Sequence, residues 1–200
     1  MKKIAIVTLS DFNNYGNRLQ NYALERIITS QGYDVVSLVD FRPNLLKTSV
    51  KTIIKKDGIK FTDRMKKIRR LKNFLDFDKK YVNTFPVNAG EFSSVSDDEY
   101  HCFIVGSDQV WNPDWAKYTY DRMFLRFCSP TKRISYAASF GVDKIPEKWV
   151  DKYKAGLIDF KALSVREDKA VDIVKNTIGI TCHKVLDPTM LLERAEWDKI

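Results

Sequence analysis

The sequence contains few cysteines and no long hydrophobic run, and each shortage excludes a class of protein. The three cysteines, Cys102, Cys128 and Cys182, are an odd number, lie far apart and form no CxxC pair. This pattern favours reduced thiols over a disulfide scaffold, so we expect a cytoplasmic protein. No apolar stretch is long enough to span a bilayer. The apolar run after Met1 is short and is interrupted by Thr8, so we interpret it as a strand and not as a signal peptide.

Histidine is also scarce, which bears on metal binding. The two histidines, His101 and His183, each stand beside a cysteine inside an expected strand. Adjacent strand residues point to opposite faces of a sheet, so neither His–Cys pair is placed to chelate one metal ion. We therefore predict no metal site.

Positive charge is abundant but local. The 200 residues are 44% hydrophobic and 30% charged, as in an ordinary soluble globular protein, and the formal net charge is +8. The segment from Lys47 to Lys80 contains thirteen Lys or Arg and four Asp or Glu, so the rest of the chain is close to neutral. Such a local excess argues against a nucleic-acid-binding protein. It fits a solvated helix face, or a surface for an acidic polysaccharide or for the inner face of an anionic membrane.

Apolar periodicity predicts alternating strands and helices. We expect strands at about 3–9, 33–40, 99–106, 132–140, 162–165 and 184–186. We expect helices at about 17–32, 59–82, 146–161 and 168–176, a further helix opening at 196, and irregular segments at 88–98 and 113–128. This order predicts a single α/β domain over residues 1–200, a Rossmann-like parallel sheet flanked by helices, with a basic helical excursion at about 42–82.

A polar loop before the first helix holds the first candidate residues. Gly16 permits a tight turn, and Asn17 with Gln20 has the spacing of a capping box, so we expect Asn17 to cap the helix. Backbone N–H groups at this helix start, together with Arg18, would suit an anion or a sugar hydroxyl. The alternative is that Gly16 and Asn17 serve only the turn and the cap, and that Arg18 is solvated.

Polar side chains gather just after the third expected strand. Gly106 allows a sharp turn, and Ser107, Asp108 and Gln109 then come close to Trp111. Residues past the carboxyl ends of parallel strands line the ligand crevice of an α/β sheet. Asp108 is therefore the candidate base toward a sugar hydroxyl, or the candidate stabiliser of developing positive charge. In the alternative interpretation Asp108 or Ser107 caps the following turn and Trp111 fills the core.

Later strand ends add further candidates. Ser139 and Gly141 end the fourth expected strand and either face the same crevice or form a tight turn. Arg166 follows the fifth expected strand and either meets an anionic ligand or is solvated. Asp187 precedes Pro188 after the sixth, where an Asp cap and a Pro at the first helical position predict a structural role.

Five sequence blocks, taken together, resemble the polysaccharide pyruvyl transferase family. They are NYGNRLQNYAL at 14–24, FIVGSDQVWN at 103–112, ISYAASFG at 134–141, SVRE at 164–167 and VLDPTMLL at 185–192. Each block alone is weak, but their order over nearly the whole chain makes the match specific for the family.

The resemblance implies an enzyme that transfers a pyruvyl group from phosphoenolpyruvate to a sugar or lipid-linked oligosaccharide of a cell-surface polysaccharide, as a ketal. Phosphoenolpyruvate would be a co-substrate, and no cofactor is expected. The resemblance also implies the N-terminal half of a GT-B type two-domain transferase, so we expect a C-terminal domain or a second copy of the chain to cover its exposed face. From the strand-end position of Asp108, we expect it to be the catalytic residue. The residues expected to bind substrate are Asn14, Gly16, Asn17, Arg18, Gly106, Ser107, Gln109, Trp111, Ser139 and Arg166.

Two alternative functions stay open on the residues alone. One is a glycosyltransferase of the same architecture that uses a nucleotide-sugar. The other is a non-catalytic sugar- or phosphate-binding half that works only with a partner domain. A nucleic-acid binder is less favoured than either, and strongly salt-dependent DNA binding would indicate it.

Overall fold

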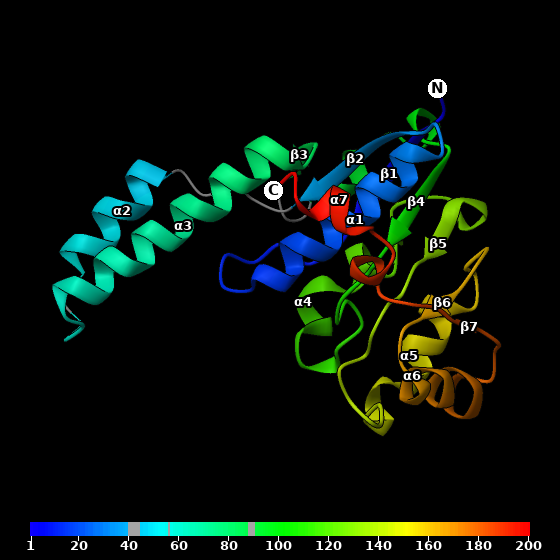
Figure 1. The fold of residues 1–200 in the computed structure, drawn as a ribbon. Coiled ribbons are helices and arrows are strands. Elements are labelled where there is room, and N and C mark those ends of the chain that lie inside the picture. The colour runs from blue at the N-terminus through cyan, green and yellow to red at the C-terminus, as the bar shows by residue number, and fades with distance from the viewer. Residues whose placement is uncertain (40–44, 56, 88–90) are drawn as a thin grey trace.

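The computed structural model describes residues 1–39, 45–55, 57–87 and 91–200 (Figure 1). Its main sheet has five strands, all parallel, in the order β3-β2-β1-β4-β5. These strands are β1 (Lys3–Val7), β2 (Asp34–Val39), β3 (Thr84–Pro86), β4 (Cys102–Val105) and β5 (Arg133–Ser135). A two-stranded parallel sheet, β6 (Ser164–Val165) with β7 (His183–Lys184), continues beyond β5 through isolated bridges. The predicted α/β class with a Rossmann-like parallel sheet is confirmed.

The central strand β1 is buried on both faces, which explains its near-continuous apolar run. Ile4 and Ile6 pack with Leu24 of helix α1 on one face, whereas Ala5 and Val7 belong to a larger core on the other face. Helix α1 spans Tyr15–Ser30, and the larger core includes residues of α4 (Pro113–Met123), α5 (Glu147–Leu157) and α6 (Asp168–Asp172). Helices therefore cover both faces of the sheet.

The remaining elements are short, apart from two helices in the basic segment. The helices are α2 (Leu45–Ile54), α3 (Phe61–Tyr81), α7 (Arg194–Trp197) and a π-helical turn after α6 (Ile173–Ile178). The 3-10 turns are Phe92–Ser94, Asp97–Glu99, Pro130–Lys132 and Pro188–Met190. Parts of the predicted strand at 33–40, of the excursion at 42–82 and of the loop at 88–98 lie outside the described residues, namely 40, 42–44, 56 and 88–90.

Two predicted boundaries were wrong for a local reason. The segment 113–128, expected to be irregular, contains α4, which Asn112 caps by accepting from the Asp114 amide at 2.9 Å. Pro113 follows the cap at the first helical position, a start signal that the many aromatic residues obscured. The strand expected at 132–140 ends at Ser135, because the chain bends at Ala137 with a φ of +50°.

Helices α2 and α3 pack against each other and project from the sheet as an arm (Figure 1). The C-terminal half of α3 is anchored on α1, where the buried Phe74 ring stacks on Tyr15 with the centroids 4.6 Å apart. At the opposite end, α2 buries none of its residues. No helix in the described part of the chain is both long and apolar enough to cross a membrane.

Candidate functional site

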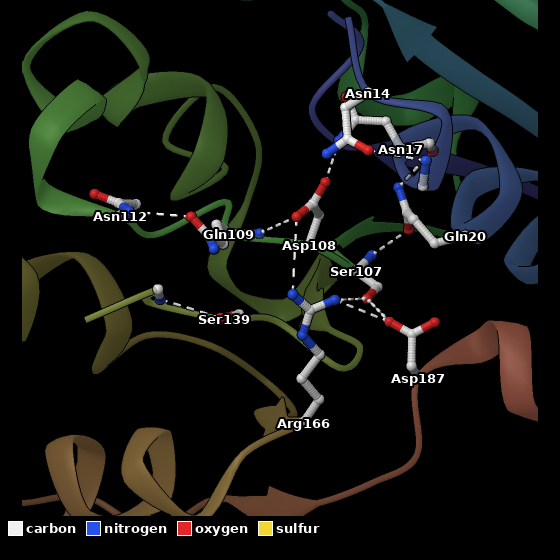
Figure 2. A network of polar contacts seen from close by, with 12 residues as sticks. Asn14, Asn17, Gln20, Ser107, Asp108, Gln109, Asn112, Ser139, Arg166 and Asp187 are labelled. Atoms are coloured by element: carbon white, nitrogen blue, oxygen red, sulfur yellow. Dashed lines mark hydrogen bonds and ion pairs between the residues drawn. The ribbon is translucent and has the colours of Figure 1, made fainter. Parts of the chain in front are cut away.

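The carboxyl ends of several strands bring polar side chains to one edge of the sheet (Figure 2). Thr8 follows β1, Ser107 and Asp108 follow β4 after a single glycine, and Arg166 follows β6. Parallel strands end on the same side of a sheet, so these residues converge with Asp187, which comes after β7. We call Ser107, Asp108, Arg166 and Asp187 the Asp108 cluster.

Gly106 sets the geometry of this edge. Its φ is +113°, and a Cβ at this position would lie 2.3 Å from the carbonyl oxygen of Tyr136. Only glycine permits that approach. Because β4 and the segment after β5 come so close here, Ser139 donates its backbone N–H to the Asp108 carbonyl at 2.9 Å. Asp108 itself has a φ of +76°, which turns its side chain away from the strand direction.

The Asp108 carboxylate is held by donors from three directions (Figure 2). Nδ2 of Asn17 donates to Oδ2, and the backbone N–H of Gln109 donates to Oδ1 at 2.7 Å. Nη2 of Arg166 lies 3.8 Å from Oδ1. The side chain keeps 14% of its surface exposed, so the carboxylate is oriented and can still meet a polar ligand.

Arg166, Asp187 and Ser107 form the other half of the cluster. Nη1 of Arg166 lies 2.9 Å from Oδ2 of Asp187, and Oγ of Ser107 donates to the same oxygen at 2.8 Å. Burial opposes ionisation of Asp187, but hydrogen bonds from Thr189, Ser107 and Arg166 outweigh it and lower its pKa. Burial opposes the charge of Arg166 as well, and its contacts with Glu167 and Asp187 raise its pKa nonetheless. Asp187 and Arg166 are therefore a charged pair at neutral pH.

Asp187 has two roles, of which the sequence indicated one. Oδ1 accepts from the Thr189 backbone N–H at 3.0 Å, so the predicted cap is confirmed. Oδ2 points into the cluster toward Arg166 and Ser107 (Figure 2). The sequence could not reveal this second role, because it depends on the fold placing Asp187 next to Arg166, 21 positions earlier, and Ser107, 80 positions earlier.

Gln20 is a member of the site that the sequence did not reveal. Its Oε1 accepts from the Ser107 backbone N–H at 2.9 Å (Figure 2). Its Nε2 donates to Oγ1 of Thr8 at 2.9 Å and to the Asn17 carbonyl at 3.0 Å. Gln20 is buried and links α1 to the ends of β1 and β4. The capping-box spacing was the only sequence signal at Gln20, and it predicted a pairing with Asn17 at the helix start instead of with Ser107.

The start of α1 differs from the prediction. The cap is Asn14, not Asn17, and its Oδ1 accepts from the Gly16 backbone N–H at 2.8 Å. Asn17 instead donates to Asp108, and its buried Oδ1 accepts no hydrogen bond. Arg18 is neither solvated nor turned toward the Asp108 cluster, because its Nε lies 2.8 Å from Oδ1 of Asp78 in a buried ion pair.

Trp111 and Ser139 are buried, against the expectation that they contact substrate. Trp111 is fully buried, and its Nε1 donates to the Met123 carbonyl at 2.9 Å. Oγ of Ser139 accepts from the Gly141 backbone N–H at 3.1 Å, which is the tight turn of the alternative interpretation. Gln109 stays near the edge, where its Oε1 accepts from Asn112 at 3.1 Å.

A different tryptophan, Trp115 of α4, is half-buried next to Gln109, the residue that follows Asp108. Its Nε1 donates to the Gln109 carbonyl at 3.2 Å. It lines an open cavity of about 310 Å³ together with Leu9, Ser10, Asp11, Thr119 and Arg122. The hydrogen bond of Trp115 links this cavity to Gln109, the residue that follows Asp108. Among the described residues, no group of three or more His, Cys, Asp and Glu is arranged to hold a metal ion.

Comparison with known proteins gives one match. The sequence model of the polysaccharide pyruvyl transferase family matches residues 14–200, which include the whole Asp108 cluster and the start of α1. Neither the search of curated proteins nor the search of solved structures found a match. Since the family match covers far more than half of the sequence, this chain belongs to the polysaccharide pyruvyl transferase family.

Proposed function

We propose that the protein transfers a pyruvyl group from phosphoenolpyruvate to a sugar of a cell-surface polysaccharide, as a ketal, and that the Asp108 cluster receives the sugar. Family membership supports the transfer of a pyruvyl group. The observation that supports the placement of the sugar is the charge balance of the cluster.

The Asp108 cluster has more acidic than basic groups. Arg166 contacts Asp108, Asp187 and Glu167, so three carboxylates surround one guanidinium. Phosphoenolpyruvate carries a phosphate and a carboxylate, and both need cationic partners. A cluster with excess negative charge disfavours that donor. It suits sugar hydroxyls, which donate hydrogen bonds to carboxylate oxygens.

The reaction needs a base at the sugar and a negative group near the reacting carbon. Two sugar oxygens bond to C2 of the donor, the bond from C2 to the phosphate oxygen breaks, and C3 gains a proton to become a methyl group. The two hydroxyl protons supply the proton at C3 and the proton that leaves with phosphate. While it is ionised, Asp108 stabilises the positive charge that develops at C2 as C3 gains its proton, and it then takes the proton from the attacking hydroxyl. Asn17 and the Gln109 amide hold its carboxylate in place.

The cavity beside Trp115 supports a sugar ligand at this position. An indole ring packs well against the apolar face of a pyranose, and Ser10 and Asp11 offer hydroxyl and carboxylate partners at the rim. The Trp115 ring is fixed by its hydrogen bond to the Gln109 carbonyl. Because Gln109 directly follows Asp108, we place the reacting hydroxyl of such a sugar toward Asp108.

The test is a transfer assay with phosphoenolpyruvate and a panel of p-nitrophenyl glycosides, in which mass spectrometry detects the ketal. Asp108→Asn keeps the volume of the side chain but removes the base, and we expect turnover to fall about a hundredfold or more. Asp172→Asn, at an exposed carboxylate of α6, is the matched control and should keep wild-type turnover. Wild-type turnover in Asp108→Asn, or transfer only from a nucleotide-sugar, would contradict the proposal.

A further inference from the structure

The outer side of α2 is an apolar stripe that faces solvent. Leu46, Val50, Ile53 and Ile54 are all exposed, with 77% of Leu46 and 68% of Ile54 accessible. At 3.6 residues per turn these four side chains lie within about 100° of one another around the helix. The spacing is that of an amphipathic helix, yet the apolar side is turned away from the protein.

The first two turns of α3, the helix that packs against α2, add two more exposed apolar side chains. Phe61 is 63% exposed, and Met65, one turn later, is also exposed. The buried Arg64 of α3 links the two helices, because its Nη1 donates to the Thr52 carbonyl of α2 at 2.5 Å and its Nη2 lies 2.5 Å from Oδ1 of Asp57. The exposed apolar side chains therefore belong to an ordered surface. We call Leu46, Val50, Ile53, Ile54, Phe61 and Met65 the arm face.

Lysines border the arm face. Lys47 and Lys51 follow the apolar stripe on one side of α2, about 20° to 60° farther around the helix than Ile54. The segment from Lys47 to Lys80 has thirteen basic and four acidic residues, an excess of nine that accounts for the whole net charge of +8. The arm thus combines exposed aliphatic and aromatic side chains with a large excess of positive charge.

This combination selects one kind of partner. Nucleic acid offers phosphates for the lysines but no apolar layer for four adjacent aliphatic side chains. A second copy of the arm would offer the apolar surface but would bring two strongly positive segments together. A bilayer with anionic lipids offers both an acyl boundary and a negative surface.

We propose that the arm face docks on an anionic lipid bilayer, with its apolar side chains at the acyl boundary and its lysines among the headgroups. The C-terminal part of α3 is tied to α1 by the buried pair of Asp78 with Arg18. Helix α1 also carries Asn17 and Gln20, which contact the Asp108 cluster. Docking would therefore hold that cluster at a fixed orientation to the membrane. The proposal does not depend on the reaction that the cluster catalyses.

The test is co-sedimentation of the protein with vesicles of phosphatidylcholine alone or with about a third of phosphatidylglycerol. We expect binding to the anionic vesicles that weakens with added salt, and weak or no binding to the neutral ones. Ile54→Ser and Lys51→Glu should each reduce the partition coefficient about tenfold. Ile158→Ser on the far side of the protein and Lys175→Glu after α6 are the matched controls and should bind like the wild type.

Failure of the wild-type protein to bind anionic vesicles would overturn the proposal. Equal binding by Ile54→Ser and Ile158→Ser would overturn it as well, because the arm face would then not be the contact. Analytical ultracentrifugation tests the competing occupant: a dimer that Ile54→Ser dissociates would assign the arm face to a second copy. Every substituted side chain is exposed, so circular dichroism should show the wild-type fold for all four variants.

Discussion

In the Asp108 cluster the charges are partly buried and held by partners at 2.7 to 3.0 Å, whereas on the arm the apolar side chains are exposed and basic residues far outnumber acidic ones. The cluster is built before any ligand arrives, because Gly106, Gln20 and Asp187 fix its donors and acceptors. The arm is an ordered surface, but the apolar side chains of the arm face stay exposed and are not packed against the rest of the chain. The contrast fits the two proposals: the cluster would act on a ligand through preorganised polar groups, and the arm would act by burying apolar surface on a partner.

Gly106→Ala tests the preorganised geometry most severely. A Cβ would lie 2.3 Å from the Tyr136 carbonyl oxygen at a φ of +113°, so we expect urea denaturation to show a loss of about 3 kcal/mol or more. Gly179→Ala is the matched control, because its φ is +81° but nothing lies within 4 Å of a Cβ there. It should cost only about 1 kcal/mol. Equal losses would mean that the close approach at Tyr136 is unimportant.

Asp78→Ala tests the joint between the body and the arm. The substitution leaves the buried Arg18 guanidinium without its carboxylate partner, so the free energy of unfolding should fall by about 3 kcal/mol. The control is Asp76→Ala, two residues away on α3, whose carboxylate pairs with Lys72 on the exposed side. That change should cost less than about 0.5 kcal/mol. A small loss in Asp78→Ala would show that the ion pair does not anchor the arm.

Glu25 of α1 makes stability depend on pH. Burial raises its pKa to about 7, although Asn83 and Ser37 donate to its carboxylate. The native state therefore keeps a proton that the unfolded state releases, so the contribution of Glu25 to stability is fully present below about pH 4.5 and is lost as the pH rises to about 7. Glu25→Gln should remove this decline, which is at most about 3 kcal/mol, in urea titrations at pH 5 and pH 8. Asp63→Asn on the arm should leave the decline intact; a wild-type slope in Glu25→Gln would refute the assignment.

Ile54→Ser on the arm face should change the free energy of unfolding by less than about 0.5 kcal/mol, because the side chain is exposed. Ile6→Val removes only one methylene, but it does so in the core of β1 and should cost about 1 kcal/mol. Thermal denaturation of both variants measures the difference. A larger loss at Ile54 than at Ile6 would mean that the arm face is covered within the protein.

The sequence predicts the sheet well because its central strands are buried on both faces. The runs at 3–9, 33–40 and 99–106 correspond to β1, β2 and β4. The edge strand β3 escapes detection because it has three residues, ends in Pro86 and is mostly exposed. Helix α2 lies within the predicted helical excursion at about 42–82, but its bounds were missed, although Leu46, Val50, Ile53 and Ile54 recur at helical spacing.

The candidate site was predictable only where it depends on strand ends. Ser107, Asp108 and Arg166 each follow a strand, and parallel strands bring such residues together. Gln20 lies on a helix and Asp187 beside a proline, and only tertiary packing turns them toward Ser107. The sequence also could not show whether Trp111 or Trp115 lines a cavity, because this depends on which indole the core buries.

The central claim is that the Asp108 cluster receives the sugar and not the anionic donor. Its most direct test is calorimetric titration of phosphoenolpyruvate into the wild-type protein and into Asp108→Asn. We predict that both proteins bind phosphoenolpyruvate equally, or the variant slightly more tightly, while ketal formation is lost in the variant. Loss of phosphoenolpyruvate binding in a folded Asp108→Asn protein would contradict the account.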